Sequence, residues 1–251
     1  MKVATWNVNG IRARGKEVAA WSAAERPDLL CLQEIKAAPD QITDKTCPMD
    51  GYRTHWHGAR GGYSGVSIHA VENLGEPTPL YVPFDFETRV LALSFKDVDV
   101  LSVYAPNGGK DYEAKMRFWN ELNEWMEVRA LDPKPLLIAG DLNITRSDLD
   151  VHPGQVDPTV IGQRPEERVL FQRFLDLGLI DSTRALHPGD DRLYTWWPYW
   201  NMARERNLGW RIDYVLTNVA GGLRPVESAV LSQFGSSDHA PVVSWFEGPG
   251  A

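Results

Sequence analysis

Cysteine is scarce in this chain, which has 251 residues and only two cysteines, Cys31 and Cys47. Two cysteines form neither a disulfide framework nor a recognisable zinc-binding pattern, so both classes of protein are excluded. Cys31 lies inside the apolar run LLCLQ, where we expect a buried small hydrophobe. The cysteine usage therefore favours a protein of a reducing compartment.

Long apolar stretches are also missing. No run approaches the ~18 apolar residues that a membrane-spanning helix needs. The first residues, MKVATWNVNG, lead directly into a strand-like pattern, without the basic region and apolar segment of a signal peptide. We therefore expect a soluble cytoplasmic protein that does not contact a membrane.

Excess positive charge is the third absence. Lys and Arg number 26 against 34 Asp and Glu, a net charge of −8. This is not the charge of a protein coated in basic residues for nucleic acid, although a local basic rim could still hold a phosphate. No low-complexity linker or obvious repeat divides the chain, so one domain spanning residues 1–251 is expected.

Many strand-like runs and a few helical patterns fill the chain. The predicted strands are Lys2–Val8, Leu29–Gln33, Tyr52–His57, Ser64–His69, Val90–Phe95, Val98–Tyr104, Leu136–Ala139, Leu193–Trp197, Trp210–Leu216, Ser228–Leu231 and Val242–Phe246. The predicted helices are Arg14–Glu25, Asp111–Arg129 with Asp111 as N-cap, and Pro165–Leu177. This pattern suggests an α/β protein with two packed sheets and helices outside them.

Polar side chains stand at the ends of these apolar runs. They are Asn7 after KVATW, Glu34 after LLCLQ, Tyr104 at the end of its strand-like run, Asp141 and Asn143 after LLIAG, Asp213 within WRIDYVL, and Asp238 with His239 before APVVSWF. A carboxylate, amide or imidazole at the end of a buried strand is costly without a use. Several oxygen ligands with one histidine suit a magnesium-dependent attack on a phosphate ester.

Each of these residues also has a simpler explanation. Glu34 could be a surface glutamate past a strand, and GDLN could be an Asx-type turn that Gly140 encourages. His239 could be a satisfied turn histidine, for which Asp213 is a candidate partner that would hold its tautomer. The joint appearance of all of them at strand ends favours one composite site.

Seven ordered motifs give the chain a family resemblance. They are ATWNVNGIRAR, DLLCLQEIK, GYSGVSI, VYAPNG, LLIAGDLNI, LGWRIDYVL and SSDHAPV, and they run from Val3 to Phe246. The chain resembles the bacterial-type exonuclease III family of abasic-site (AP) endonucleases, within the endonuclease/exonuclease/phosphatase superfamily that includes deoxyribonuclease I. The resemblance implies a four-layered α/β sandwich of two mixed β-sheets flanked by helices.

The resemblance also implies roles for the strand-end residues. Glu34 would be the main Mg²⁺ ligand, with Mn²⁺ able to substitute, and Asp238 would lie on the metal side. Asp141 would position or deprotonate the attacking water with support from Asn143, and His239, oriented by Asp213, would contact the scissile phosphate. Asn7 and Tyr104 would bond phosphate oxygens or their neighbours, and Asp141, Asn143 and Asn7 would also border the metal.

Double-stranded DNA with abasic sites or blocked 3′ ends is the substrate that the resemblance implies. Basic residues beside the motifs could form a rim for the backbone, namely Arg12, Arg14, Lys16, Lys36, Lys110, Arg204, Arg206 and Arg211. Tyr63 and Asn107 match positions that contact DNA in the family. Trp196, Trp210 and Ile212 match the pocket that encloses a flipped baseless sugar, although Trp196 could instead pack in the core.

Three positions depart from the family pattern. Asn9 stands where animal members carry an aspartate, Lys110 where they carry an arginine, and Gln163 where members usually carry an aromatic residue. These departures bear on DNA penetration and lesion preference rather than on the chemistry. No sequence feature compels an oligomer, so we expect a monomer, and the bacterial-type resemblance implies a nucleoid-associated activity.

The resulting hypothesis is a Mg²⁺-dependent DNA repair nuclease. It would hydrolyse the bond 5′ to an abasic site, leaving a 3′-hydroxyl, and would also act as a 3′→5′ exonuclease or 3′-phosphodiesterase. The alternatives are an enzyme that is mainly a double-strand 3′→5′ exonuclease, a hydrolase of lipid or small phosphate esters, and a catalytically inactive DNA-binding module.

Overall fold

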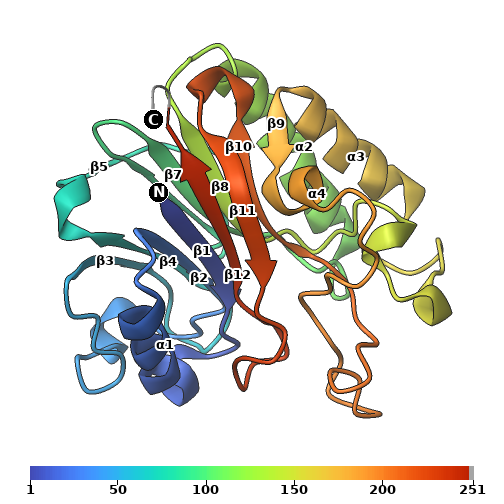
Figure 1. The fold of residues 1–251 in the computed structure, drawn as a ribbon, viewed down its shortest axis with the longest axis horizontal. Coiled ribbons are helices and arrows are strands. Elements are labelled where there is room, and N and C mark those ends of the chain that lie inside the picture. The colour runs from blue at the N-terminus through green and yellow to red at the C-terminus, as the bar shows by residue number, and fades with distance from the viewer. Residues whose placement is uncertain (249–251) are drawn as a thin grey trace.

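Two six-stranded mixed β-sheets form the centre of the molecule, whose computed structural model describes residues 1–248 (Figure 1). In spatial order, the first sheet contains β11 (Arg224–Val230), β12 (Val242–Glu247), β1 (Lys2–Asn7), β2 (Leu29–Gln33), β4 (Val66–Val71) and β3 (Tyr52–His57). The second contains β5 (Thr78–Pro79), β6 (Val90–Ser94), β7 (Asp99–Tyr104), β8 (Leu136–Asp141), β10 (Asp213–Asn218) and β9 (Leu179–Asp181).

Helices cover the outer faces of both sheets. Helix α1 (Ile11–Glu25) lies outside the first sheet, and α2 (Tyr112–Arg129) and α3 (Pro165–Asp176) lie outside the second, with the short α4 (Ser182–Leu186) near β9 (Figure 1). The expected four-layered α/β sandwich is therefore confirmed. Within residues 1–248, no helix has the length and apolar content needed to cross a membrane.

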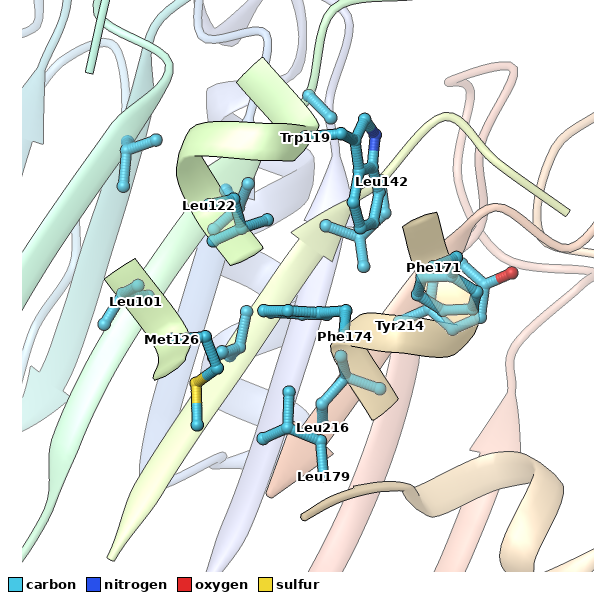
Figure 2. Close-up of a cluster of buried hydrophobic side chains, with 14 of the residues drawn as sticks. Leu101, Trp119, Leu122, Met126, Leu142, Phe171, Phe174, Leu179, Tyr214 and Leu216 are labelled. Atoms are coloured by element: carbon cyan, nitrogen blue, oxygen red, sulfur yellow. The ribbon is translucent and has the colours of Figure 1, made fainter. Parts of the chain in front are cut away.

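Three apolar clusters separate the four layers. One lies between the sheets and joins residues such as Cys31 and Ile68 to Val100 and Val215. A second lies between α1 and the first sheet. The third packs α2 and α3 onto the second sheet, where aromatic rings from both helices meet the strands (Figure 2). Because buried apolar area is the main favourable term in folding, these clusters fix how the strand ends meet.

The α2–α3 cluster shows why these helices form where they do. Trp119, Leu122 and Met126 follow helical spacing and face the sheet, and Phe171 and Phe174 pack edge-on against Trp119 (Figure 2). Asp111 caps α2 as predicted, since its side chain accepts a hydrogen bond from the Ala114 N–H at 2.9 Å.

Several sequence-based boundaries were wrong. Leu193–Trp197 is not a strand, because Trp196 makes only isolated bridges to Trp210 and His239. Helix α1 begins at Ile11 rather than Arg14. The elements β5, β9 and α4 were not predicted, and their two, three and five residues are too short to produce a readable period. The prediction of Cys31 as a buried residue is confirmed.

Candidate functional site

The polar strand ends converge at one edge of the sandwich. Tyr104, at the end of β7, pairs in register with Asp141 at the end of β8, which in turn pairs with Asp213 at the start of β10. Asn7 closes β1 in the facing sheet, and Glu34 directly follows β2. Residues far apart in sequence thus share one site, because β1, β2, β7 and β8 end at the edge where β10 begins.

Local backbone conformation turns the chain sharply at this edge. Glu34 and Asn143 both have positive φ, 51° and 53°, which is uncommon outside glycine and clusters at functional sites. Gly140 allows β7 and β8 to approach closely, because a Cβ there would lie 1.9 Å from the carbonyl oxygen of Val103. Any larger residue at this position would displace Asp141.

Asn7 joins the two carboxylates at the centre of the site. Its side-chain nitrogen donates to Glu34 Oε1 and to Asp141 Oδ2, both at 2.9 Å. The other oxygen of Asp141 accepts from the backbone N–H of Asn143 at 3.0 Å. The side-chain nitrogen of Asn143 donates to the Ala105 carbonyl at 2.9 Å, which leaves its Oδ1 as the acceptor available to the site.

His239 lies beside Asp141 and is held by Asp213. Its Nδ1 is 2.9 Å from Asp213 Oδ2, and its Nε2 is 3.8 Å from Asp141 Oδ2. Thr195 donates to the same Asp213 oxygen at 2.6 Å and so fixes the carboxylate. This arrangement directs Nε2 of the imidazole into the site, which is the orientation that the predicted role requires.

Asp238 lines the same site through a separate set of contacts. Its Oδ1 accepts from Asn9 at 2.9 Å and from the Tyr199 hydroxyl at 3.1 Å, and its Oδ2 accepts from the Trp196 indole at 3.2 Å. Burial would raise the pKa of Asp238, but the His239 charge and these hydrogen bonds outweigh it and lower the pKa. Asp238 is therefore a carboxylate that stays ionised.

Asp141 and His239 both retain protons to unusually high pH. Burial raises the pKa of Asp141 to about 8 against the opposing charge of His239, and the Asp213 and Glu34 carboxylates add to the increase. Burial alone would lower the pKa of His239, but the Asp213 and Asp141 charges outweigh it and raise the pKa to about 10. Buried carboxylates crowded around one imidazole thus favour proton retention at the centre of the site.

Glu34 and Tyr104 complete this electrostatic pattern. Burial would raise the pKa of Glu34, but hydrogen bonds from Asn7 and Lys36 outweigh it and keep the carboxyl ionised. The Lys36 ammonium lies 2.7 Å from Glu34 Oε2. Burial, together with Glu34 and Asp141, holds the pKa of the Tyr104 phenol well above 10, so the phenol can donate a hydrogen bond.

The donor set fits a hard divalent cation. Glu34, Asp141 and His239 each offer a ligand atom, and these atoms lie within 4.8 Å of one another. Mg²⁺ prefers carboxylate oxygens and needs few protein ligands, so the ionised Glu34 fits it, and Asp141 fits it once its proton is lost. His239 is less suited, because a protonated imidazole has no lone pair for a metal.

A cavity of about 320 Å³ joins this charged group to an aromatic wall. Its lining comprises Glu34, Tyr104, Asn107, Asp141, Asn143, Ile161, Trp196, Trp210, Ile212, Asp238 and His239. Trp196 and Trp210 pack edge to face, with ring centroids 5.4 Å apart. Trp196 therefore faces the cavity and is not confined to the core.

Three of the side chains predicted to contact DNA are accessible to solvent. Tyr63 is 51% exposed, and Arg12 and Lys110 are exposed. A second cavity of about 280 Å³ adjoins the first through Asn107, and Tyr63, Arg89, Lys110 and Arg117 contribute to its lining. Lys36 points instead toward Glu34 and Asn9, so its ammonium is already engaged within the site.

Two residues assigned to the basic rim have other positions. Arg211 is 1% exposed and is bound by Asp150 and Asp181 at 2.7 and 2.8 Å. Arg204 donates to backbone carbonyls of the segment 232–237. The sequence prediction was wrong for both, because a buried or loop-bound arginine cannot be distinguished from a rim arginine by local sequence.

Sequence reasoning missed three residues that shape the site. Thr195 binds Asp213, Ile161 lines the cavity, and Lys115 donates to the Asn143 carbonyl at 2.7 Å while pairing with buried Glu167 at 2.6 Å. Lys115 did carry a signal, because it stands on the apolar face of α2 with Trp119 and Leu122. No comparable signal marks Thr195 or Ile161.

Comparisons with known proteins agree with this geometry. The model of the Endonuclease/Exonuclease/phosphatase family matches residues 4–239. The exodeoxyribonuclease of Bacillus subtilis is 33% identical over 96% of this chain and 98% of its own length. Among solved structures, a variant of the 3′ phosphatase NExo from Neisseria, bound to a product DNA hairpin, is 32% identical with a TM-score of 0.87, covering 98% of this chain and 99% of its own. An AP endonuclease of Archaeoglobus fulgidus is 29% identical with a TM-score of 0.86 and the same coverage of both chains.

Proposed function

Since the chain belongs to the endonuclease/exonuclease/phosphatase family and is a phosphodiester-hydrolysing nuclease, we propose that its preferred substrate is duplex DNA with abasic sites. It would cut the phosphodiester 5′ to the lesion, leaving a 3′-hydroxyl, and would also remove blocked or normal nucleotides from 3′ ends. One domain, acting as a monomer, would carry both activities, and a location in the cytoplasm beside the chromosome fits this substrate.

The single observation that supports this proposal is the shared cavity. One part of its lining carries the ionisable groups Glu34, Asp141 and His239, and another part carries Trp196, Trp210 and Ile212. The first part suits hydrolysis of a phosphate ester, and the second suits a flat or compact apolar group. A sugar without its base can enter such a space next to the reacting phosphate, whereas a sugar with a base meets the aromatic rings.

The chain's own residues have complementary parts in the hydrolysis. In its ionised form, Asp141 would take a proton from the attacking water, supported by Asn143, as the water oxygen bonds to phosphorus and the 3′ oxygen leaves. His239, held by Asp213 at 2.9 Å, would present Nε2 to a phosphoryl oxygen and stabilise its growing negative charge. Tyr104 would hold a further oxygen through its phenol. Asn7, whose two amide N–H groups bond Glu34 and Asp141, would keep these neighbours of the phosphate in place.

Mg²⁺ is the cofactor that we propose, with Mn²⁺ as a substitute. Glu34 would hold it, and Asp141, Asn143, Asn7 and Asp238 would contribute further oxygen atoms. When bound, the ion would supply positive charge to the phosphate oxygens. The contribution of the protein is a set of carboxyl and amide oxygens in fixed positions.

A cleavage assay tests the proposal. End-labelled duplexes, one with a single abasic-site analogue and one undamaged, would be incubated with Mg²⁺ and, separately, with chelator. A single Mg²⁺-dependent cut 5′ to the analogue is expected. Shortening of both duplexes from their 3′ ends would show an exonuclease without lesion selectivity. Intact duplexes under all conditions would contradict the proposal.

A further inference from the structure

Trp210 in the aromatic wall is held from outside the cavity. Its indole Nε1 donates to the side-chain oxygen of Gln155 at 2.9 Å. One neighbour of the ring is Trp196, and another is Gly162, where a Cβ would lie only 3.2 Å from Cζ3 of the indole. The position of this half-buried ring therefore depends on one hydrogen bond and on close packing against a backbone segment.

Gln155 belongs to a segment with little apolar anchoring. Residues 153–160 between β8 and α3 are mostly exposed, including Val156 and Val160. Two bonds attach the η4 turn (Pro153–Gln155) to the loop before Trp210. The His152 N–H donates to the Gly209 carbonyl at 3.0 Å, and Gln155 Nε2 donates to the Leu208 carbonyl at 3.5 Å. Such a segment needs polar contacts to keep one conformation.

Gln163 supplies these contacts. Its side chain is 1% exposed, its Oε1 accepts from the Asp157 N–H at 2.9 Å, and its Nε2 donates to the Gln155 carbonyl at 3.1 Å. Both ends of the buried amide are thus bonded to the segment that carries Gln155. An aromatic residue at position 163 would fill space but could not make either hydrogen bond.

From this chain of contacts we infer that Gln155 is a positioning residue for Trp210, and that Gln163 and Gln155 together set how strictly the cavity excludes a nucleotide that keeps its base. The inference rests on the proposed function. Without the acceptor on Gln155, the indole N–H loses its partner and the ring can rotate away from Trp196. Rotation would widen the cavity and reduce discrimination between abasic and undamaged DNA.

Four proteins test this inference: wild type, Gln155→Met, Gln155→Glu and Gln172→Met. Met keeps the volume without the acceptor, Glu keeps the acceptor, and Gln172 is an exposed residue of α3 that bonds Asp176, away from the cavity. The ratio of dissociation constants for abasic and undamaged duplexes would be measured in chelator, where nothing is cleaved. Loss of one hydrogen bond is expected to lower this selectivity about three- to tenfold in Gln155→Met, with wild-type values in the other two variants.

A double-mutant cycle separates positioning from general destabilisation. Trp210→Phe has no indole N–H, so adding Gln155→Met to it should change the selectivity no further. The inference is overturned if Gln155→Met leaves the ratio unchanged, weakens both duplexes equally, or has its full effect in the Trp210→Phe background.

If the wild type binds both duplexes equally, the proposed substrate is refuted, but the positioning role of Gln155 is not yet tested. A direct measurement on Trp210 tests that role independently. The indole N–H resonance of Trp210 can be assigned in a ¹⁵N–¹H spectrum by its loss in Trp210→Phe. Gln155→Met should make this proton exchange faster with water, and Gln155→Glu should restore its protection. Equal exchange rates in wild type and Gln155→Met would reject the positioning role.

Discussion

Two clusters of buried charged residues lie near the same strand ends, and they differ in how their charges are balanced. The site cluster brings the carboxylates of Glu34, Asp141 and Asp213 around the His239 imidazole. The supporting cluster pairs Asp150 and Asp181 with arginines, in contacts of 2.5 Å from Arg184 to Asp150 and 2.8 Å from Arg211 to Asp181. Both clusters are buried, so burial does not distinguish them.

The pKa shifts show what does distinguish them. Burial raises the pKa of Asp141, and nearby carboxylates raise it further, to about 8. Burial would also raise the pKa of Asp150, but the Arg211 and Arg184 charges and hydrogen bonds outweigh it, so the pKa is lowered. The site cluster has three carboxyl groups around one imidazole and retains protons, which a cation could replace, whereas arginines already balance the supporting cluster. An unbalanced buried cluster is a mark of function.

The largest expected effect comes from unbalancing the supporting cluster. Arg211→Met leaves Asp150 and Asp181 buried without their shared guanidinium, so the free energy of unfolding should fall by about 3–5 kcal/mol. Denaturant unfolding would measure the change. Arg206→Met is the matched control, because Arg206 is exposed and its loss should cost no more than about 0.5 kcal/mol. A similarly small change in Arg211→Met would show that the cluster does not stabilise the fold.

Adding a cation to the site cluster should have the next largest effect. Mg²⁺ at about 100 times its dissociation constant should stabilise the wild type by about 2.7 kcal/mol, raising Tm by several degrees. Glu34→Gln should lose most of this shift, because a neutral amide is a poor ligand for a hard cation. Glu121→Gln, at an exposed position of α2, should keep the full shift. An equal Mg²⁺ shift in Glu34→Gln and wild type would exclude Glu34 as a ligand.

Lowering the pH should reduce the contribution of the supporting cluster to the free energy of unfolding. The pKa of Asp150 in the folded protein lies below the unfolded value of 3.8. Its favourable contribution to the free energy of unfolding is therefore present above pH 3.8 and is lost as pH falls through the folded-state pKa. The gap in unfolding free energy between wild type and Asp150→Asn should therefore narrow below about pH 4. Urea unfolding at several pH values would measure it. A gap that stays constant or widens would mean that the arginines do not lower this pKa.

The sequence predicted which polar residues meet at this edge, because the ends of apolar strands can be located from local sequence. Asn7, Glu34, Asp141 and His239 follow or precede apolar runs, and ordered motifs connect them to one family. The packing around the site was less predictable. Arg211 was assigned to the rim although it is buried, since its two partners, Asp150 and Asp181, are each at least 30 residues away. Gln155 and Thr195 had no local pattern, because their roles come only from tertiary contacts.

The shortest strands were not predicted, because they too depend on long-range contacts. The two-residue β5 and three-residue β9 form through pairing with β6 and β10, so their own sequences carry little information. In contrast, α2 was predicted with its cap, since Asp111 and a long apolar period are both local signals. Local periodicity thus predicts the layers, whereas long-range contacts decide the details of the site.

The measurement that tests the account most directly is the paired activity and stability of Asp141→Asn. The pKa of Asp141 in the folded protein is raised from 3.8 to about 8. Its favourable contribution to the free energy of unfolding is therefore complete below pH 3.8 and is lost as pH rises through about 8. A neutral amide has no such dependence, so in chelator the variant should gain stability relative to wild type as pH rises from about 4 to about 9. Cleavage of abasic duplex in Mg²⁺ should fall by about 10²–10³. Loss of stability together with activity, at every pH, would contradict the claim that this cluster serves catalysis rather than folding.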